Sequence, residues 1–415
     1  MPYRAAGNEL TSMGAPSLAV PSVGAPTEGR RPSPGTTADR GRLRSLDAFR
    51  GFIMFTLAAG GFGTVQMAHS FPDSGWAVAA RQFSHTPWEW GVFWDLIMPS
   101  FLLMVGVAMP FSYAKRSGAG DSFQRQFGHA LLRAATLGLI GIAMMNQNAR
   151  FLNVLTQIAL GYVFVFLLLG RSLRTQLAWG VGVLIAWWAL FAIHPLPGPG
   201  YNFAAAGAKA SDVLPGFFGH WTRNVNLAAD FDRWLLNLLP ADKAFVAHVG
   251  STTTLNFIPS SANMLLGVIA GQVLLGPRGP GEKLRWLVVV GVACLALGTL
   301  AGFTVCPVVK RIWTPSFALW SGGLSLWMLA GFYAVVDVAG WNRWVRPLEI
   351  LGTNSIAVYL MTLTWPAWIV KTSKSLFGAT ALGGAYGPVW EHLVVLGVIW
   401  AVAWWLWHRR IFLRV

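Results

Sequence analysis

Long apolar segments alternate with short polar ones from about residue 48 to the end of the chain. About 20 mostly apolar residues are enough for a helix to cross the hydrocarbon core of a bilayer. We find ten such segments, near 48–68, 92–114, 129–146, 151–169, 176–194, 257–275, 285–304, 316–338, 348–369 and 389–408. The pattern predicts an all-α fold, a bundle of about ten transmembrane helices, with a tight hairpin at 146–150.

Residues 1–44 do not share this pattern. They are rich in Pro, Gly, Ser and Thr, contain several arginines and lack the apolar run of a secretory signal. Such a composition is typical of a disordered tail. We therefore divide the chain into a disordered cytoplasmic tail, 1–44, and a transmembrane domain, 45–415.

The composition supports a membrane protein and argues against nucleic-acid binding. Hydrophobic residues make up 54% of the chain and charged residues 11%, where soluble domains average about 25% charged. The 22 tryptophans suit two membrane interfaces. The formal charge of +15 is dispersed between apolar segments and forms no basic patch, so we expect no nucleic-acid partner.

The distribution of Lys and Arg predicts the orientation. With the N-terminus inside, the inner segments carry 19 of these residues and the outer segments 10. Because cytoplasmic loops are enriched in positive charge, both termini are expected in the cytoplasm, with the protein in the cell (inner) membrane. His85 then lies at the outer face.

One outer loop, about residues 195–256, is unusually long. Apolar residues between Phe231 and Leu239 recur at helical spacing, which predicts a short amphipathic helix on the outer surface beside His85. A plain interfacial helix and a lid over a site are both consistent with this pattern.

His85 and Asp95 are the most suggestive chemical pair. His85 is a titratable group at the membrane face, and Asp95 stands about one turn inside the second predicted span. A carboxylate at the centre of a membrane helix costs about 2.5–3.5 kcal/mol to insert, and less near the interface. We favour proton-transfer chemistry by this pair over a purely structural carboxylate at a helix N-terminus.

Other polar positions allow both a structural and a functional interpretation. Asp47 and Arg50 lie on one face of the first helix, where they can cap it and pair, or bind phosphate groups of a cytosolic ligand. Gln157 and Asn256 can bond neighbouring helices or line a cavity. The histidines show no metal-ligand spacing, so no metal is expected. The small pair Gly267 and Gly271 predicts close helix packing.

Several motifs occur together in a recognisable order. The chain resembles the heparan-alpha-glucosaminide N-acetyltransferase family and its bacterial relatives, which are integral membrane acyltransferases. The motifs that carry the resemblance are Arg42–Gly51, the block from His85 to Gly106, Asp232–Leu235, Lys310–Phe317 and Gly352–Tyr359. Together they extend over nearly the whole chain after residue 42.

The resemblance implies that cytosolic acetyl-CoA donates an acetyl group to a sugar or glycan on the far side of the membrane. The family histidine that His85 matches is the proposed catalytic residue. From the residue pattern and the family resemblance together, we assign catalysis to His85 and Asp95. We assign acyl-CoA binding to Asp47, Arg50, Asn354 and Ser355, and acceptor binding to Trp88, Glu89, Gln157 and Asn256.

Two departures from the family pattern are visible. Trp88-Glu89-Trp90 stands where the family commonly has Trp-Asn-Gly, and Thr156-Gln157 replaces a Gln-Arg pair. A transporter of a small solute, a flippase for a lipid-linked glycan and a non-catalytic scaffold are the alternatives. Besides the bilayer, acyl-CoA and the acceptor, a homodimer is left open as an assembly.

Overall fold

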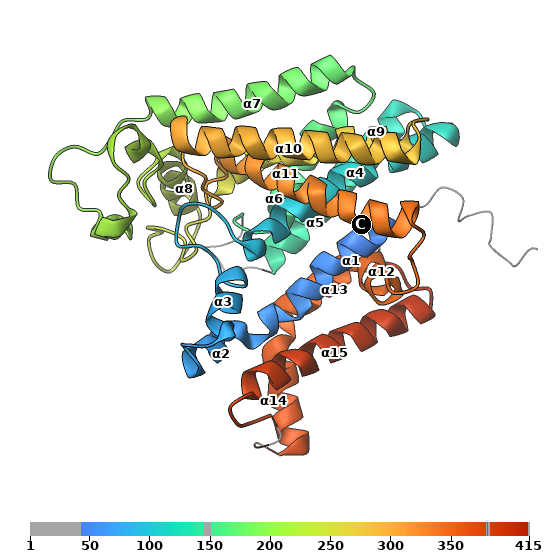
Figure 1. Cartoon of the computed structure of the whole chain (residues 1–415). Coiled ribbons are helices and arrows are strands. Elements are labelled where there is room, and N and C mark those ends of the chain that lie inside the picture. The colour runs from blue at the N-terminus through green and yellow to red at the C-terminus, as the bar shows by residue number, and fades with distance from the viewer. Residues whose placement is uncertain (1–42, 145–150, 379, 381, 414–415) are drawn as a thin grey trace, which may run out of the picture. The chain divides into compact units, whose positions relative to one another are not determined.

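The structure of the chain is a computed structural model. It describes residues 43–144, 151–378, 380 and 382–413. Within these residues the chain forms helices and no strand, apart from isolated bridges that join Glu89 and Trp90 to Val309 (Figure 1). The expected all-α fold is confirmed for this part of the chain. The expected tail lies almost entirely outside the described residues, and so does the expected hairpin turn at 146–150.

Seven described helices are long and apolar enough to cross a membrane. They are α1 with α2 (Arg44–Ser70), η3 with α4 (Phe93–Gly118), α7 (Leu173–Ile193), η8 with α9 (Thr254–Leu275), α10 (Pro280–Thr304), α11 with η9 (Pro315–Val338) and α15 (Gly387–His408). These lengths and compositions identify a membrane protein with several spans.

Three of the ten expected spans correspond to helices outside this group of seven. One is α5 (Phe123–Ala143). The next, α6 (Val154–Leu167), has 14 residues and is about 21 Å long, less than the roughly 30 Å of a hydrocarbon core. The third segment, 348–369, is divided among α12 (Arg346–Thr353), α13 (Ser355–Thr364) and the first turn of α14 (Pro366–Phe377). The count of ten therefore stays a prediction.

The first expected span, 48–68, is interrupted. Helix α1 (Arg44–Ala58) ends before a short 3-10 turn at Gly60–Gly63, and α2 (Thr64–Ser70) follows it. All four residues of the turn, Phe62 included, have positive φ. Glycine adopts this left-handed backbone without steric cost, so the Gly-rich sequence ends α1 here.

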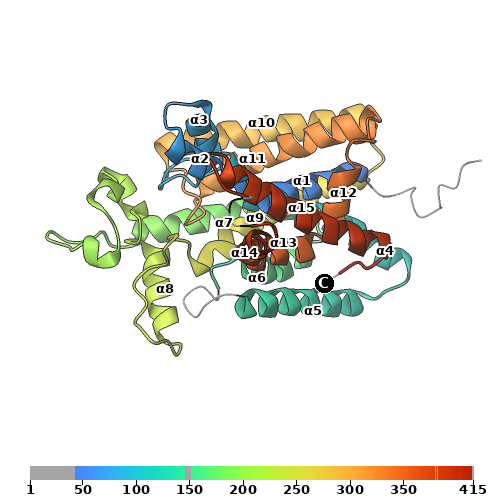
Figure 2. The same cartoon turned by 90° about the horizontal axis from the view of Figure 1, so that it is seen from below.

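Different helices lie at the two ends of the bundle. At one end, Arg44 of α1 bonds Glu349 of α12 at 2.7 Å, and the Asn354 amide nitrogen donates to the Ile411 carbonyl at 3.0 Å. The beginning of α1 and the end of α15 therefore lie together, at what we term the α12 end. Figures 1 and 2 show α2, α3 (Gly75–Gln82) and α8 (Leu227–Asn237) toward the opposite end, the α3 end.

Close helix packing joins α4 (Ile97–Gly118) to α9 (Phe257–Leu275). A β-carbon at Gly106 would overlap the carbonyl of Met264. One at Gly267 or at Gly271 would likewise overlap backbone of α4. Small residues allow this backbone contact, so the packing expected of Gly267 and Gly271 is confirmed.

The long loop before α9 has structure of its own. It contains α8 (Leu227–Asn237), in the region where a short helix is expected. Asp232 and Leu236 of α8 are buried, whereas Trp234 and Leu238 are largely exposed. The apolar pattern therefore predicts the helix correctly but not which of its residues pack against the protein.

Candidate functional site

Two hydrogen bonds to distant parts of the chain hold the loop that carries His85. The Trp90 amide donates to the Val308 carbonyl at 2.6 Å, in the segment between α10 and α11. The indole of Trp88 donates to the Trp221 carbonyl at 3.0 Å. Both contacts join residues that are far apart in sequence, so the loop is held against the long loop before α9 and the α10–α11 turn.

Asp95 is the buried anchor of the site. It lies in the 3-10 turn Phe93–Leu96 that leads into α4, and only 1% of its side chain is exposed. Its Oδ2 accepts hydrogen bonds from the Val92 amide at 3.3 Å and from the Thr86 hydroxyl at 3.3 Å. Buried carboxylates require such donors, because an unpaired buried charge is strongly unfavourable.

His85 contacts the other carboxylate oxygen. Its Nδ1 lies 2.6 Å from Oδ1 of Asp95, so the structure brings together the two residues expected to act as a pair. We assign the hydrogen to Nδ1, because this short contact to a carboxylate needs a donor. Nε2 is then the unprotonated nitrogen. Since 42% of the side chain is exposed, this nitrogen can receive a proton from a substrate.

Lys310 completes the arrangement. Its Nζ donates to Asp95 Oδ1 at 3.0 Å and lies 3.3 Å from Nδ1 of His85, while its side chain is only 13% exposed. The turn that holds it is fixed by Thr314, whose hydroxyl oxygen accepts from the amides of Val309 and Phe317. The three side chains thus form a compact group of one carboxylate, one cation and one imidazole.

Sequence reasoning did not select Lys310 as a site residue. It is separated from His85 by 225 positions, so no local spacing connects the two residues. The available signal was its place in the motif Lys310–Phe317, one of those that carry the family resemblance.

The surroundings keep the imidazole neutral near physiological pH. The hydrogen bond to Asp95 acts to raise the pKa of His85, but burial and the charges of Lys310 and Arg311 outweigh it and lower the pKa below the ordinary value. Burial also lowers the pKa of Lys310, against the attraction of Asp95. A neutral imidazole with a free Nε2 is the form that a general base requires.

Gln157 and Asn256 belong to a second polar group beside this one. The Gln157 amide nitrogen donates to the Asn256 carbonyl at 3.1 Å, and the Asn256 amide nitrogen donates to the Arg311 carbonyl at 2.8 Å. Arg311 directly follows Lys310, so this chain of bonds leads to the turn that holds Lys310. The structure therefore connects these two expected acceptor residues to the backbone of the site.

The other two expected acceptor residues differ in exposure. Trp88 is buried in a cluster with Trp187 and Trp221, which makes it an anchor of the loop. Glu89 is exposed and is bridged through its backbone to Val309. Of the two, Glu89 alone presents its side chain to solvent.

The expected acyl-CoA residues lie at the α12 end. Arg50 and Asp47 form an ion pair with 3.5 Å between Nη1 and Oδ1, as their spacing of three residues predicts. The Asn354 side chain is fully buried, and it bonds Ile411 and Leu413 of the C-terminal segment. This favours a structural role for Asn354, while Ser355 next to it is partly exposed at the start of α13.

These features define a class of protein: a multi-span helical membrane protein with a His–Asp–Lys group, built around a buried carboxylate, at one end of its bundle. No family model matches the chain. Two curated proteins are similar to it, both heparan-alpha-glucosaminide N-acetyltransferases. The Homo sapiens protein is 24% identical over an alignment of 372 residues that includes 77% of this chain. The Mus musculus protein is 25% identical over 404 residues and 84% of this chain.

The chain is therefore a distant relative of the heparan-alpha-glucosaminide N-acetyltransferases. The alignments include 52% and 57% of the two mammalian proteins, so the chain spans about half the length of the curated relatives it matches.

Proposed function

We propose that this protein is a membrane acyltransferase, which transfers an acetyl or other acyl group from acyl-CoA to an amine or hydroxyl of a sugar or glycan. The relationship to named N-acetyltransferases supports acyl transfer in general. The donor and the acceptor are the finer part of the proposal.

The observation that carries the proposal is the hydrogen bond between His85 and the buried Asp95. It orients the imidazole so that Nδ1 faces the carboxylate, which leaves Nε2 as the nitrogen available to a substrate. A carboxylate in this position also stabilises the imidazolium that forms when the base takes a proton. Positioned general bases of this kind typically contribute about 10²- to 10⁴-fold to a reaction rate.

The chemical step follows from this geometry. Nε2 of His85 takes the proton of the acceptor N–H or O–H as the acceptor attacks the thioester carbonyl. The C–S bond then breaks, and the proton held by the imidazole can pass to the departing thiolate of CoA. A route in which His85 first accepts the acyl group is the second option, and it would give an acyl-histidine intermediate.

The two ends of the bundle divide the roles in this proposal. Arg50 at the α12 end would contact phosphates of acyl-CoA, and the acceptor would approach His85 at the α3 end. The excess of Lys and Arg in the loops of the α12 end supports placing that end in the cytoplasm. The thioester would then reach through the bundle toward His85.

The test uses purified full-length protein in liposomes, with labelled acetyl-CoA outside and glucosamine inside. We expect labelled N-acetylglucosamine from the wild type. His85→Ala should lower its formation by at least about a hundredfold, because the positioned base is removed. His69→Ala removes an exposed imidazole on α2 and should leave the rate unchanged.

Equal rates for His85→Ala and the wild type would reject the catalytic assignment. Failure of the wild type to acetylate any of a panel of amino sugars and sugar alcohols, together with net movement of a solute across the liposomes, would favour the transporter alternative.

A further inference from the structure

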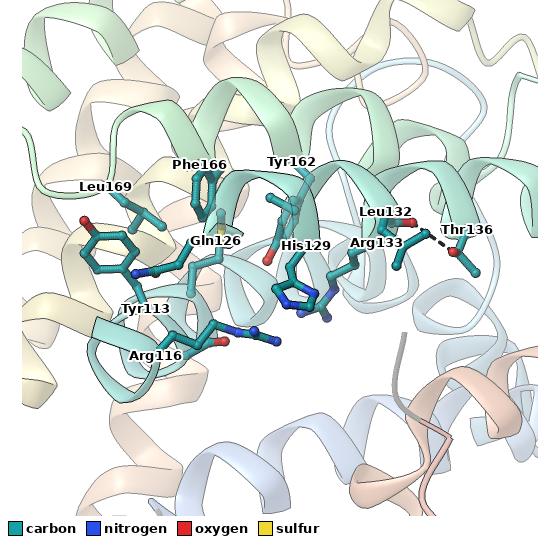
Figure 3. Close-up of a pocket in the computed structure, with 13 residues that line it drawn as sticks. Tyr113, Arg116, Gln126, His129, Leu132, Arg133, Thr136, Tyr162, Phe166 and Leu169 are labelled. Atoms are coloured by element: carbon teal, nitrogen blue, oxygen red, sulfur yellow. Dashed lines mark hydrogen bonds between the residues drawn. The ribbon is translucent and has the colours of Figure 1, made fainter. Parts of the chain in front are cut away.

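A cavity lies away from His85, between α4, α5 and α6. Its volume is about 260 Å³. Each helix contributes one face: Tyr113 and Arg116 come from α4, His129 and Arg133 from α5, and Tyr162 from α6 (Figure 3). The residues from α4 lie in its last turns and those from α5 lie in its first half, so the cavity is near the α4–α5 connection at the α12 end (Figure 2).

The cavity is lined by more basic than acidic groups. Figure 3 shows the nitrogen atoms of Arg116, His129 and Arg133 on the same side of α5. The carboxylate of Asp121 provides a counter-charge for this group, because it lies 3.6 Å from Arg116 and 3.1 Å from Arg125. Asp121 shares its single carboxylate between these two arginines, so it does not neutralise the positive charge of Arg133.

Arg133 is held in place but is not fully bonded. Its guanidinium lies over the ring of Tyr162, 5.1 Å from the ring centre, which fixes it by a cation–π contact. Its Nε is buried and has no hydrogen-bond partner among the described residues. A buried donor left without an acceptor is costly, typically about 1–3 kcal/mol, so this site favours a molecule that accepts.

Gln126 contributes a hydrogen-bond acceptor that lacks a donor among the described residues. Its side chain is 4% exposed, and its amide nitrogen donates to the Ser117 hydroxyl and the Asp121 carbonyl. Those two bonds fix the orientation of the amide, and Oε1 lacks a partner in the described part of the chain. The cavity therefore offers an unsatisfied acceptor as well as an unsatisfied donor.

We infer that this cavity binds a phosphate ester that also carries a hydroxyl or amino group. The phosphate oxygens would accept from Arg133 and Arg116, since guanidinium groups match phosphate geometry. The hydroxyl or amine would donate to Oε1 of Gln126. The apolar and aromatic remainder of the lining, including Phe166 and Leu169, suits the body of such a molecule.

Two molecules at a membrane surface have this chemistry. An anionic phospholipid with a glycerol headgroup carries a phosphodiester and hydroxyls. Acyl-CoA carries phosphates, ribose hydroxyls and an adenine amine. The inference of a phosphate site does not depend on acyl transfer, and the experiment separates the two sources.

The experiment uses full-length protein in nanodiscs. Acetyl-CoA binding is measured by calorimetry, with S-acetyl-pantetheine as a ligand that lacks phosphate. Retention of phosphatidylglycerol relative to phosphatidylcholine is measured by native mass spectrometry. Arg133→Gln should weaken binding of one of the two phosphate ligands by about tenfold, as expected for loss of a hydrogen bond to a charged group. Binding of S-acetyl-pantetheine should not change.

Two further variants test whether the effect depends on the charge at position 133 and on the position of the arginine in the cavity. Arg133→Lys should recover part of the affinity, because it restores the charge. Arg125→Gln removes a 70% exposed arginine that also pairs with Asp121 but does not line the cavity, and it should have no effect. A loss confined to acetyl-CoA identifies the donor as the occupant, and one confined to phosphatidylglycerol identifies a lipid. Normal binding of both ligands by folded Arg133→Gln and Arg116→Gln, or an equal loss in Arg125→Gln, would overturn the inference.

Discussion

The α3 end and the α12 end of the bundle both contain ion pairs, but they use them differently. At the α12 end, Arg44 pairs with Glu349 and Arg50 with Asp47, so each of these charges has a counter-charge close by. At the α3 end, Asp95 contacts two basic groups at once, His85 and Lys310. A closed pair stabilises a helix contact, whereas a shared carboxylate with an imidazole open on its other side can take part in proton transfer.

The ends also differ in how they are packed. Glycines bring α1 and α12 into backbone contact, because a β-carbon at Gly51 would overlap the Leu348 carbonyl and one at Gly352 would overlap that of Asp47. The His85 loop has no such packing and is held by side-chain and backbone hydrogen bonds. Chemistry at the α3 end therefore depends on a polar network, and this difference can be tested by substitution.

The largest effect in these tests is expected from Asp95→Asn. It removes the charge that orients and stabilises His85, so acyl transfer should fall by at least about tenfold, which is part of the roughly 10²- to 10⁴-fold that a positioned base contributes. It also leaves Lys310 buried without its partner, which typically costs about 3–5 kcal/mol. Transfer is measured in the liposome assay and stability by denaturation.

The double variant separates these two effects. Asp95→Asn combined with Lys310→Met removes both charges, so we expect stability to recover while transfer stays low. Recovery of transfer along with stability would mean that Asp95 only holds the fold.

Glycine packing gives the next effect. Gly106→Val should destabilise the protein by about 1–3 kcal/mol or more, because its side chain would enter the backbone of α9. Gly128→Ala in α5 is the control, since nothing lies within 4 Å of its β-carbon. Alanine should stabilise the helix there by about 0.5–1 kcal/mol. Thermal unfolding in detergent compares the two, and similar midpoints would contradict the packing seen between α4 and α9.

Lys310→Met should shift the pH dependence of transfer without abolishing it. The base works only when His85 is neutral, so transfer declines as pH falls through its pKa. Lys310 helps to lower that pKa, and its removal raises it. The acidic limb of the pH–rate profile should therefore move to higher pH. An unmoved limb, or a shift to lower pH, would remove Lys310 from the electrostatics of the site.

The smallest effect is expected at the α12 end. If Arg50 contacts a phosphate of acyl-CoA, Arg50→Ala should weaken acetyl-CoA binding by up to about fivefold, the range of partly exposed ion pairs. Arg44→Ala breaks the pair with Glu349 instead and should leave that affinity unchanged. Calorimetry distinguishes them, and equal affinities in all three proteins would leave Asp47 and Arg50 as a structural pair.

The sequence by itself determined the features that depend on local spacing. Apolar runs of bilayer length predicted the helices, and two glycines four residues apart predicted a packed face. His85 and Asp95 are ten residues apart in one loop and turn, so their pairing could also be anticipated. The helix breaks at Gly60–Gly63 and near Asn354 were not predicted, because each is a short interruption inside a segment that is mostly apolar over the length of a bilayer.

Tertiary structure alone decided which distant residues meet. Lys310 reaches Asp95 across 215 positions, and Gln157 reaches Asn256 across 99. The cavity between α4, α5 and α6 combines one face of each of three helices. Spacing along a helix says which residues share a face, but the packing of helices decides which faces meet. It also decides whether a lysine between two spans is solvated or, like Lys310, buried against a carboxylate.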